Sequence, residues 1–477
     1  MGEPAAATAD SALTRRLVRS ALAVDGVLTP VDDFWPWYAD RRDRLWQEVE
    51  RIPFTGLGEW EFAPGTGNLV HDSGRFFSVE GLDVRLDRGP VRAWSQPIIH
   101  QPEIGILGIL VKDFDGVLHC LMQAKSEPGN RNGVQISPTV QATMSNYQRV
   151  HGGRPVPYLD VFRDAAPPQV LADALQSEQG SWFYRKRNRN MIVEVTDEVE
   201  VGEDFRWLTI GQLHRFLTID NLVNMEARTV LSCLPMYGDG LDDLAEAGGD
   251  GWADALVRSL SGAYGGPHSD RGVLSRITGS RAGRRPSAEL IPLDGVRNWR
   301  RTPDAISHED GRYFSVVAVR VEAAGREVRR WAQPLVRPQG QGVAAWLVRR
   351  VDGVLHVLVH ARVEPGYLDV TELAPTVQCV PDDHAHLPPA DRPPFLDDVL
   401  GAPADRIHFD TVLSEEGGRF HHAENRYLII EAGDGAAAEP PDGYWWVSLF
   451  QLTWLVQHSH YLNVQARTLL ACLRGRW

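Results

Sequence analysis

The chain has 477 residues, of which 43% are hydrophobic and 23% are charged, a composition typical of a soluble protein with two or three domains. Its formal net charge of −14 argues against nucleic acid or an anionic membrane as the main partner, although a local basic pocket could still bind phosphate. The four cysteines show no CxxC spacing, no apolar run is long enough to span a membrane, and the N-terminus lacks the apolar core of a signal peptide. We therefore expect a cytoplasmic protein without disulfides.

The hydrophobic periodicity alternates along the chain between the patterns of helices and strands. Helices are expected at 11–23, 34–51, 170–179 and 223–234. Strands are expected at 75–85, 91–99, 117–124 and 191–195. An irregular loop rich in Pro, Gly and Asn follows the third strand and continues to residue 141. This order predicts an α+β fold in which helices pack on a mixed sheet.

The second half of the chain repeats the first. The segment DGVLHCLMQAKSEPG begins at Asp115, and DGVLHVLVHARVEPG begins at Asp352, 237 positions later. NMEARTVLSCL begins at Asn224, and NVQARTLLACL begins at Asn463, 239 positions later. A repeat of this length indicates two copies of a whole domain rather than a solenoid. We expect an N-terminal helical segment at 1–53, a first domain at 54–237, a Gly-rich and Arg-rich linker that matches neither copy at 238–290, and a second domain at 291–477.

One loop carries the most specific motif of the chain. It reads KSEPGNRNGVQISPTVQ at 125–141 and RVEPGYLDVTELAPTVQ at 362–378, so the EPG and PTVQ frame is kept while the middle changes. Together with the SNY and VHGG segments that follow the first copy, this motif resembles the NDP-hexose 2,3-dehydratase family, and the resemblance extends over 34–477. It implies two tandem Nudix-like domains that arose by duplication.

The resemblance also implies a reaction in deoxysugar and antibiotic biosynthesis. The enzyme would remove the C2 hydroxyl of dTDP-4-keto-6-deoxyglucose and leave a 3,4-diketo-2,6-dideoxy sugar for an NADPH-dependent 3-ketoreductase. A ketone at C4 acidifies the C3 proton, so the site needs a base near C3, a donor for the C4 oxyanion and an acid for the departing hydroxide. It also needs cations for the diphosphate and an apolar slot for thymine. We expect no redox cofactor, and we expect a homodimer.

The sequence lacks the metal ligands of a Nudix hydrolase. Such an enzyme binds Mg²⁺ through an Arg-Glu and a Glu-Glu pair that precede a Gly. The corresponding stretch here is DALQSEQG at 173–180, where Glu178 alone falls at a ligand position. We therefore expect no catalytic metal, and hydrolysis of the diphosphate is disfavoured.

Comparison of the two copies selects candidate residues. Side chains shared by both copies can be explained by folding or by ancestral ligand binding, whereas those in one copy alone are candidates for chemistry. The catalytic candidates are Lys125, Glu127, Tyr147 and His151. The substrate-binding candidates are Asn130, Gln135, Ser137, Thr139, Gln141, Ser145, Asn146, Arg185, Arg187, Asn188 and Arg189. A second, degenerate pocket is expected at Glu364, Thr376, Gln378, Asn425 and Arg426.

The candidates are given distinct roles. We assign stabilisation of the C4 oxyanion to Lys125, and proton transfer at C3 and at the leaving hydroxyl to Tyr147 or His151. The residues expected on one strand face, where they would bind the diphosphate, are Arg185, Arg187 and Arg189. Lys186 is expected to point away from them.

Structural explanations compete with these assignments. Glu127 could brace its loop, Tyr147 could be a packing residue, His151 could belong to a surface turn, and the arginine run could be a solvated strand face. Three functional alternatives also stay open. The second copy, or a pocket shared between the copies, could be the active one; the protein could be a non-catalytic regulator that binds a nucleotide sugar; or it could be a Nudix-type hydrolase of nucleotide sugars.

Overall fold

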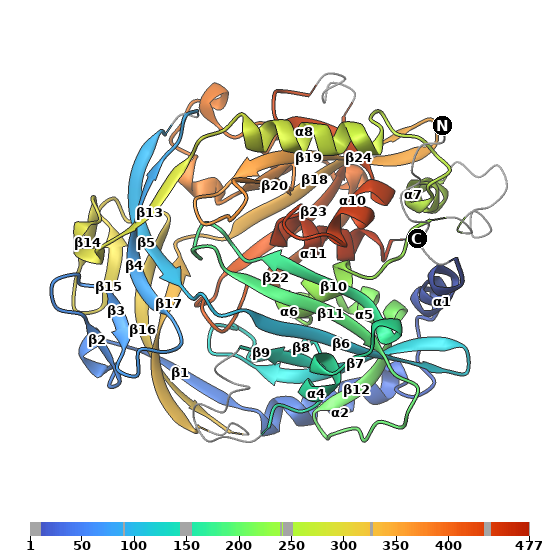
Figure 1. Ribbon diagram of the computed structural model, residues 1–477, viewed down its shortest axis with the longest axis horizontal. Coiled ribbons are helices and arrows are strands. Elements are labelled where there is room, and N and C mark those ends of the chain that lie inside the picture. Colours follow the sequence, from blue (N-terminus) through green and yellow to red (C-terminus); the bar gives the residue numbers. More distant parts are fainter. Residues whose placement is uncertain are drawn as a thin grey trace.

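The computed structural model describes residues 11–88, 91–143, 155–238, 241, 251–324, 328–433 and 440–476. Within these ranges the strands form four sheets, two of seven strands and two of five, and the α+β class is confirmed. In Figure 1 the five-stranded sheets lie together on the left and the seven-stranded sheets lie to their right, one above the other. None of the described helices is long and apolar enough to cross a membrane.

One seven-stranded sheet belongs to the first copy. Its strands, in spatial order, are β10 (Val170–Ser177), β11 (Arg187–Glu194), β6 (Gly105–Phe114), β7 (Val117–Ser126) and β12 (Phe205–Thr209), with β8 (Val134–Ser137) on β7 and β9 (Val140–Ala142) on β6. β11 pairs in parallel with β6 and the other pairs are antiparallel, so the sheet is mixed. The helices of this copy are α1 (Ser11–Leu22), α2 (Val31–Arg44), α4 (Leu159–Arg163), α5 (Ile210–Phe216) and α6 (Met225–Ser232).

The second copy builds the same sheet. Its strands are β22 (Ile407–Ser414), β23 (Glu424–Glu431), β18 (Gly342–Val351), β19 (Val354–Val363) and β24 (Tyr444–Ser448), with β20 (Thr371–Ala374) on β19 and β21 (Val377–Cys379) on β18. The helices that follow its strands are α9 (Leu396–Leu400), α10 (Leu449–Val456) and α11 (Val464–Leu473). β23 and β18 form the parallel pair that corresponds to β11 and β6. The duplication read from the sequence is therefore also a duplication of topology.

The central hairpin of each copy turns at an Asp-Gly pair. Asp115 and Gly116 have φ angles of 53° and 81°, and Asp352 and Gly353 have φ angles of 51° and 76°. A two-residue turn with positive φ at both positions matches the twist of its strands, and Asp-Gly accepts that conformation well. The DG of the repeated DGVLH segment is thus explained by the hairpin.

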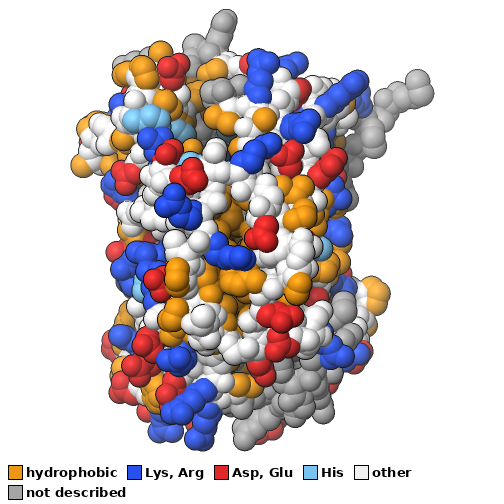
Figure 2. Space-filling view, turned by 90° about the vertical axis from the view of Figure 1, so that its left-hand side faces the viewer, with side chains coloured by type: hydrophobic (Ala, Val, Ile, Leu, Met, Phe, Trp, Pro, Cys, Tyr) orange, Lys and Arg blue, Asp and Glu red, His pale blue; other side chains and the backbone are white. Residues whose placement is uncertain are grey.

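The five-stranded sheets exchange a strand between the copies. The first contains β2 (Trp60–Phe62), β3 (Leu69–His71), β4 (Ser78–Arg85), β5 (Ala93–His100) and β13 (Ser287–Ile291). The second contains β14 (Trp299–Arg301), β15 (Ala305–His308), β16 (Phe314–Ala323), β17 (Arg330–Pro338) and β1 (Gln47–Ile52). The early strand β1 pairs with β16, and the later strand β13 pairs with β4. Figure 2 views this side of the molecule, where hydrophobic side chains gather near the middle of the face.

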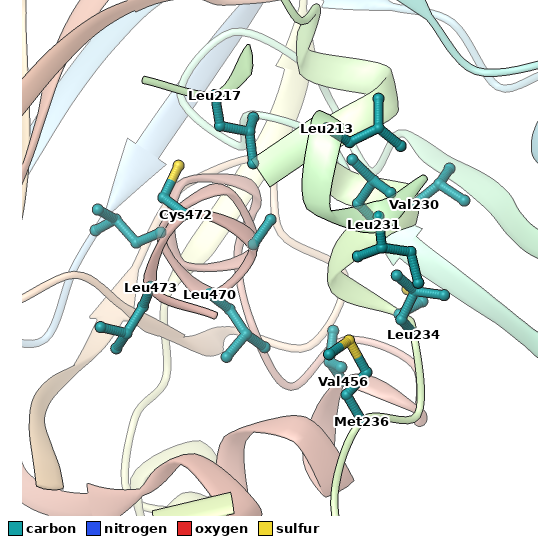
Figure 3. Close-up of a cluster of buried hydrophobic side chains, with 14 of the residues drawn as sticks. Leu213, Leu217, Val230, Leu231, Leu234, Met236, Val456, Leu470, Cys472 and Leu473 are labelled. Carbon is teal, nitrogen blue, oxygen red and sulfur yellow. The ribbon is translucent and has the colours of Figure 1, made fainter. Parts of the chain in front are cut away.

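The two copies share one hydrophobic core. Figure 3 shows side chains from α5, α6, α10 and α11 gathered in this cluster. Two fully buried arginines connect the copies. Arg228 of α6, in the first copy, donates to the carbonyl of Ser414 in the second, and Arg467 of α11, in the second copy, donates to the carbonyl of Ser177 in the first. Each arginine satisfies a buried carbonyl group of the other copy, so these bonds join the two copies through their shared core.

Three expectations about secondary structure are corrected. The segment 170–179 is not a helix but largely the strand β10, because its neighbours in the sheet override the helix propensity of Leu, Ala and Glu. The helix expected at 34–51 is α2, which ends at Arg44, and β1 follows. The region 238–290 is not a linker without a counterpart, because it contains α7 (Trp252–Leu260) and α8 (Asp270–Ala282).

These two helices correspond to α1 and α2 of the first copy. Ser20 of α1 donates to the carbonyl of Leu118 and accepts from the backbone N–H of Ile210. Ser259 of α7 makes the same pair of bonds, to Leu355 and from Leu449. The sequences of these helices have diverged while their contacts have not, and this divergence is the reason that the match was missed.

Candidate active site

A cavity of about 870 Å³ lies where the two copies meet. The charged residues of its first-copy wall include Lys125, Glu127, Glu178, Lys186 and Glu226, and those of its second-copy wall are Arg330, Glu416 and Arg419. Its aromatic lining consists of Trp60, His71, Phe76, Phe77, Phe183 and Trp331. This volume and this mixture of apolar and charged walls are typical of a small-molecule binding site. The lining agrees with the alternative of a pocket shared between the copies.

The EPG loop presents an ion pair to this cavity. Lys125 Nζ lies 3.2 Å from Glu127 Oε1, and Gln141 Nε2 donates to the same oxygen over 2.8 Å. Gln141 Oε1 in turn accepts from Ser137 Oγ at 3.0 Å and from Asn224 Nδ2 at 3.3 Å. The orientation of Glu127 and Lys125 is therefore fixed by a chain of hydrogen bonds that ends on α6.

The frame of this loop is kept because it docks against the other copy. Gly129 N donates to the carbonyl of Gly417 over 2.7 Å, and a Cβ at Gly129 would lie 1.6 Å from the carbonyl oxygen of Phe420. Gly366 N donates to the carbonyl of Gly180 over 2.7 Å, and a Cβ at Gly366 would lie 1.8 Å from the carbonyl oxygen of Phe183. Each EPG loop thus needs a Gly where it crosses the other copy.

A second carboxyl group is held at the floor of the cavity. Asn188 Nδ2 donates to Glu178 Oε1 over 2.6 Å, and Asn188 Oδ1 accepts from the backbone of Gly105 at 3.0 Å. Burial raises the pKa of Glu178 above its ordinary value. Lys186 is buried, donates to the carbonyl of Glu103, and has its pKa lowered to about 8 by burial.

Two further carboxyl groups face the same space. Glu226, in the first turn of α6, is 2% exposed, and neither of its carboxyl oxygens has a hydrogen-bond partner among the described residues. Burial raises its pKa well above the ordinary value, and the nearby carboxylates of Glu127 and Glu416 raise it further. Burial also raises the pKa of Glu416 to about 8, against the opposing charge of Arg419. Burial in this cavity therefore favours the neutral, protonated forms of these carboxyl groups.

The structure brings some of the predicted residues together and leaves others outside the cavity. Those that line it are Lys125, Glu127, Thr139, Gln141 and Asn188. Ser137 and Gln135 do not line the cavity. Ser137 donates to Gln141, which does line it, and Gln135 accepts from Ser414 Oγ of the second copy at 2.9 Å. Asn130 donates to the carbonyl of Gly133 and closes its own loop. Ser145, Asn146, Tyr147 and His151 lie outside the described residues.

The arginine run differs from its predicted geometry. Arg185 precedes β11 and has a φ of 51°, so the three arginines do not share one strand face. Arg189 forms a two-pronged pair with Asp173, at 2.8 and 2.6 Å. None of the three belongs to the lining of the cavity, whereas Lys186, which was expected to point away, does belong to it. The backbone turn at Arg185 shifts the alternation of side chains by breaking the strand.

The residues expected to form a second pocket keep the hydrogen-bonded frame of the first and some of its charges. Arg362 Nε and Gln378 Nε2 donate to Glu364 Oε1 at 2.8 and 3.0 Å, as Lys125 and Gln141 do to Glu127. Asn425 donates to Glu415, Thr376 accepts from the backbone of Leu347, and Arg426 pairs with Asp410. The residues that stand here at the positions of Glu226, Glu416, Arg419 and Lys186 are Gln465, Gln179, Trp182 and Ala423.

Sequence reasoning missed Glu226, Glu416 and Arg419. The signal was present in the repeat, since each of them is replaced by an uncharged residue at the matched position. Glu416 and Arg419 were overlooked because they lie in the copy that was expected to be inactive. Only the crossing of the loops reveals that they complete the pocket of the other copy.

Among the residues that the structure describes, no three His, Cys, Asp or Glu side chains are grouped so that they could hold a metal ion. The carboxyl groups of the cavity are instead spread around Lys125 and Arg419. Their arrangement suits proton transfer and the binding of an anionic ligand.

Comparison with known proteins identifies the family. The family described as NDP-hexose 2,3-dehydratase matches the chain twice, at residues 31–234 and 270–473. A dTDP-4-dehydro-6-deoxy-alpha-D-glucopyranose 2,3-dehydratase of Saccharopolyspora spinosa is 50% identical over 477 residues, which cover 99% of this chain and 97% of that protein. Proteins of the same name from Amycolatopsis orientalis and Streptomyces violaceoruber are 51% and 48% identical, over 96% and 94% of this chain and 93% and 98% of their own lengths. The resemblance based on the EPG and PTVQ motif is confirmed, and the chain belongs to the NDP-hexose 2,3-dehydratase family.

Proposed function

We propose that this protein eliminates water from dTDP-4-keto-6-deoxyglucose, removing the C2 hydroxyl and leaving a 3,4-diketo-2,6-dideoxy sugar. The observation that carries this proposal is the shared cavity, whose lining combines Lys125 of the first copy with carboxyl groups of both copies that have pKa values raised by burial. The names of the three relatives support the same substrate.

Lys125 is suited to stabilise the oxyanion that develops at C4 when the C3 proton leaves. Its ammonium is held by Glu127 at the cavity wall, and its side chain is 18% exposed. A fixed positive charge in a largely dry site stabilises a developing enolate more than water does. Glu127 therefore acts as the residue that positions Lys125, in agreement with the brace expected from its survival in the second copy.

The base at C3 remains assigned to Tyr147 or His151. The support for this assignment is the position of the residues on either side, because Thr143 and Pro155 both line the cavity. Replacing Tyr147 by Phe or His151 by Ala should lower turnover by roughly two to four orders of magnitude, whereas His384→Ala, at the position that matches Tyr147, should not. Loss of activity in His384→Ala alone would assign the base to the second copy.

The nucleotide half of the substrate fits the remaining walls. Arg419 and Lys186 supply cations for the diphosphate, and Trp60, Phe76 and Trp331 supply an aromatic surface for thymine. Arg419 is anchored by Gln101, whose Oε1 accepts from Arg419 Nε at 3.2 Å. A mobile surface arginine would lose more entropy on binding than this one does.

We also propose the finer features that the sequence led us to expect. Each copy is a Nudix-like domain that has lost its metal ligands, and the protein acts as a cytoplasmic homodimer without a cofactor. The 3,4-diketo product is reactive, so a 3-ketoreductase that uses NADPH consumes it.

A coupled assay tests the reaction. With dTDP-4-keto-6-deoxyglucose, a 3-ketoreductase and NADPH, the protein should yield a 2,6-dideoxy-4-keto sugar nucleotide; without the reductase, the product should decay and release dTDP. Stoichiometric dTMP and sugar phosphate, formed only with Mg²⁺, would identify a hydrolase instead. Tight binding of the substrate without turnover would identify a regulator.

A further inference from the structure

Glu226 is a buried acid that the fold itself does not use. It lines the cavity, it is 2% exposed, and both of its carboxyl oxygens lack hydrogen-bond partners among the described residues. Buried polar groups in folded proteins are nearly always paired, so an unpaired carboxyl group that faces a cavity indicates a group kept for a ligand or a reaction.

The second copy shows that the fold accepts an amide at this position. Gln465 stands in the first turn of α11, where Glu226 stands in α6, and its Nε2 donates to Glu415 Oε2 over 3.2 Å. α6 and α11 otherwise share their N-cap, since Asn224 and Asn463 each accept from a backbone N–H three residues later. The carboxyl group of Glu226 is therefore not required for the helix or for its packing.

The charges around Glu226 favour its neutral form. The groups that face it from the first copy are Lys125 and Glu127, and the group that faces it from the second copy is Glu416. Beyond Glu416 lie Arg419, Glu127, Glu178 and Lys186. Burial and the two carboxylates raise the pKa of Glu226, and the opposing effect of Lys125 is smaller. Burial and the neighbouring acidic groups therefore favour the form of Glu226 that carries its proton.

We propose that Glu226 donates its proton to the C2 hydroxyl as this group leaves. This inference rests on the proposed function. The base removes the C3 proton, and the electron pair of the C3–H bond forms the enolate that Lys125 stabilises. The pair then forms the C2–C3 double bond as the C2–O bond breaks, and the oxygen takes the proton of Glu226 and departs as water. The resulting enol at C3 tautomerises to the 3-ketone, and Glu226 regains a proton from Glu416 or from solvent.

The division of work between Glu226 and Lys125 follows from their charge. The ammonium of Lys125 is held in place by Glu127 and is therefore suited to stabilise an oxyanion. A neutral carboxylic acid can give up a proton to hydroxide without leaving a strong base behind. Both residues line the same cavity, so one bound sugar can contact both of them.

The variant Glu226→Gln tests the role with a side chain that the matched helix already carries. The reaction is run in D₂O, and the incorporation of deuterium at C3 of the recovered substrate is measured. Dehydration is measured on the same sample with the coupled assay, and the wild-type protein is treated in parallel. We expect dehydration to fall by roughly two to four orders of magnitude, while C3 exchange continues and dTDP affinity stays within a few-fold. Gln465→Ala, at the matched position of the second copy, should keep turnover within a few-fold of wild type.

The pH profile adds a readout that a structural role would not change. Turnover of the wild-type protein should decline at alkaline pH as Glu226 loses its proton, and Glu226→Asp should retain part of the activity and this decline. A folded Glu226→Gln variant that dehydrates the substrate within a few-fold of the wild-type rate would overturn the inference. A loss of C3 exchange as large as the loss of dehydration would also overturn it, because Glu226 would then act at C3. Absence of dehydration in the wild-type protein would instead refute the proposed function on which the inference rests.

Discussion

Gly129 of the first copy donates its backbone N–H to the carbonyl oxygen of Gly417 of the second copy, over 2.7 Å. This bond brings the EPG loop against the loop that carries Glu416 and Arg419, so the pocket of one copy is completed by the other. Duplication has therefore not produced one working and one idle domain in this protein. At the positions that match Glu226 and Lys186 the second copy carries the uncharged Gln465 and Ala423, while its Glu416 and Arg419 line the cavity shared with the first copy.

Gly129→Ala should weaken this docking, because the added Cβ would lie 1.6 Å from a backbone oxygen of Phe420. We expect the free energy of unfolding to fall by roughly 1 to 3 kcal/mol, as for other overpacked sites. Gly366→Ala, whose Cβ would lie 1.8 Å from the Phe183 oxygen, should cost a similar amount. Turnover of folded protein should fall much further in Gly129→Ala, because only its loop carries Lys125. Equal turnover in the two variants would contradict the assignment of the active pocket.

The stability of the protein should depend on the ionisation of Glu416. Its folded-state pKa of about 8 lies above the ordinary 4.5, so the folded state holds a proton that the unfolded state releases between these values. The contribution of this group to stability is complete below the unfolded pKa and is lost as the pH rises through the folded pKa. Urea unfolding at about pH 5 and about pH 8.5 should show a smaller decline in Glu416→Gln than in wild type. An unchanged decline would show that Glu416 ionises normally in the folded protein.

Binding of dTDP distinguishes two assignments of the diphosphate site. Sequence reasoning placed the diphosphate on the run that includes Arg187, whereas the cavity is lined by Arg419. Arg419→Gln should weaken dTDP binding roughly tenfold or more, since a partly buried charge would be lost from the site. Arg187→Gln should leave the affinity within a few-fold. Titration calorimetry with dTDP measures both, and the opposite result would restore the arginine run as the binding site.

Much of the fold could be predicted because the two copies in the chain can be compared with each other. The repeated segments fixed two copies, and the alternation of residues located strands such as β4, β5 and β7. The strand exchange of β1 and β13 could not be predicted, because their pairing depends on contacts between residues about 200 to 270 positions apart, such as Ala288 with Val84 and Val49 with Val321. No local pattern encodes which of two similar sheets an edge strand will join.

The candidate site was predictable in part for a similar reason. Lys125, Glu127 and Gln141 stand in the shared motif and do line the cavity. Glu226 offered no local signal, because a Glu in the first turn of a helix is ordinarily an exposed residue that the helix dipole favours. Its burial is created by the EPG loop and by the loop of the other copy, and it becomes visible only when the chain is folded.

Lys125→Met should separate the role of the ammonium from that of its stem. Methionine keeps an unbranched side chain of similar length, so the apolar contacts are retained, while Glu127 loses its cation and keeps the bond from Gln141. Loss of a preorganised donor to an oxyanion typically lowers turnover by roughly two to three orders of magnitude. Because the C4 enolate would no longer be stabilised, C3 exchange in D₂O should fall together with dehydration, unlike in Glu226→Gln.

The matched variant is Arg362→Met, which removes the cation from Glu364 in the second copy and should leave turnover within a few-fold of wild type. Continued C3 exchange in a folded Lys125→Met protein would show that another group stabilises the oxyanion, and Lys186, at the same cavity, would be the next residue to replace.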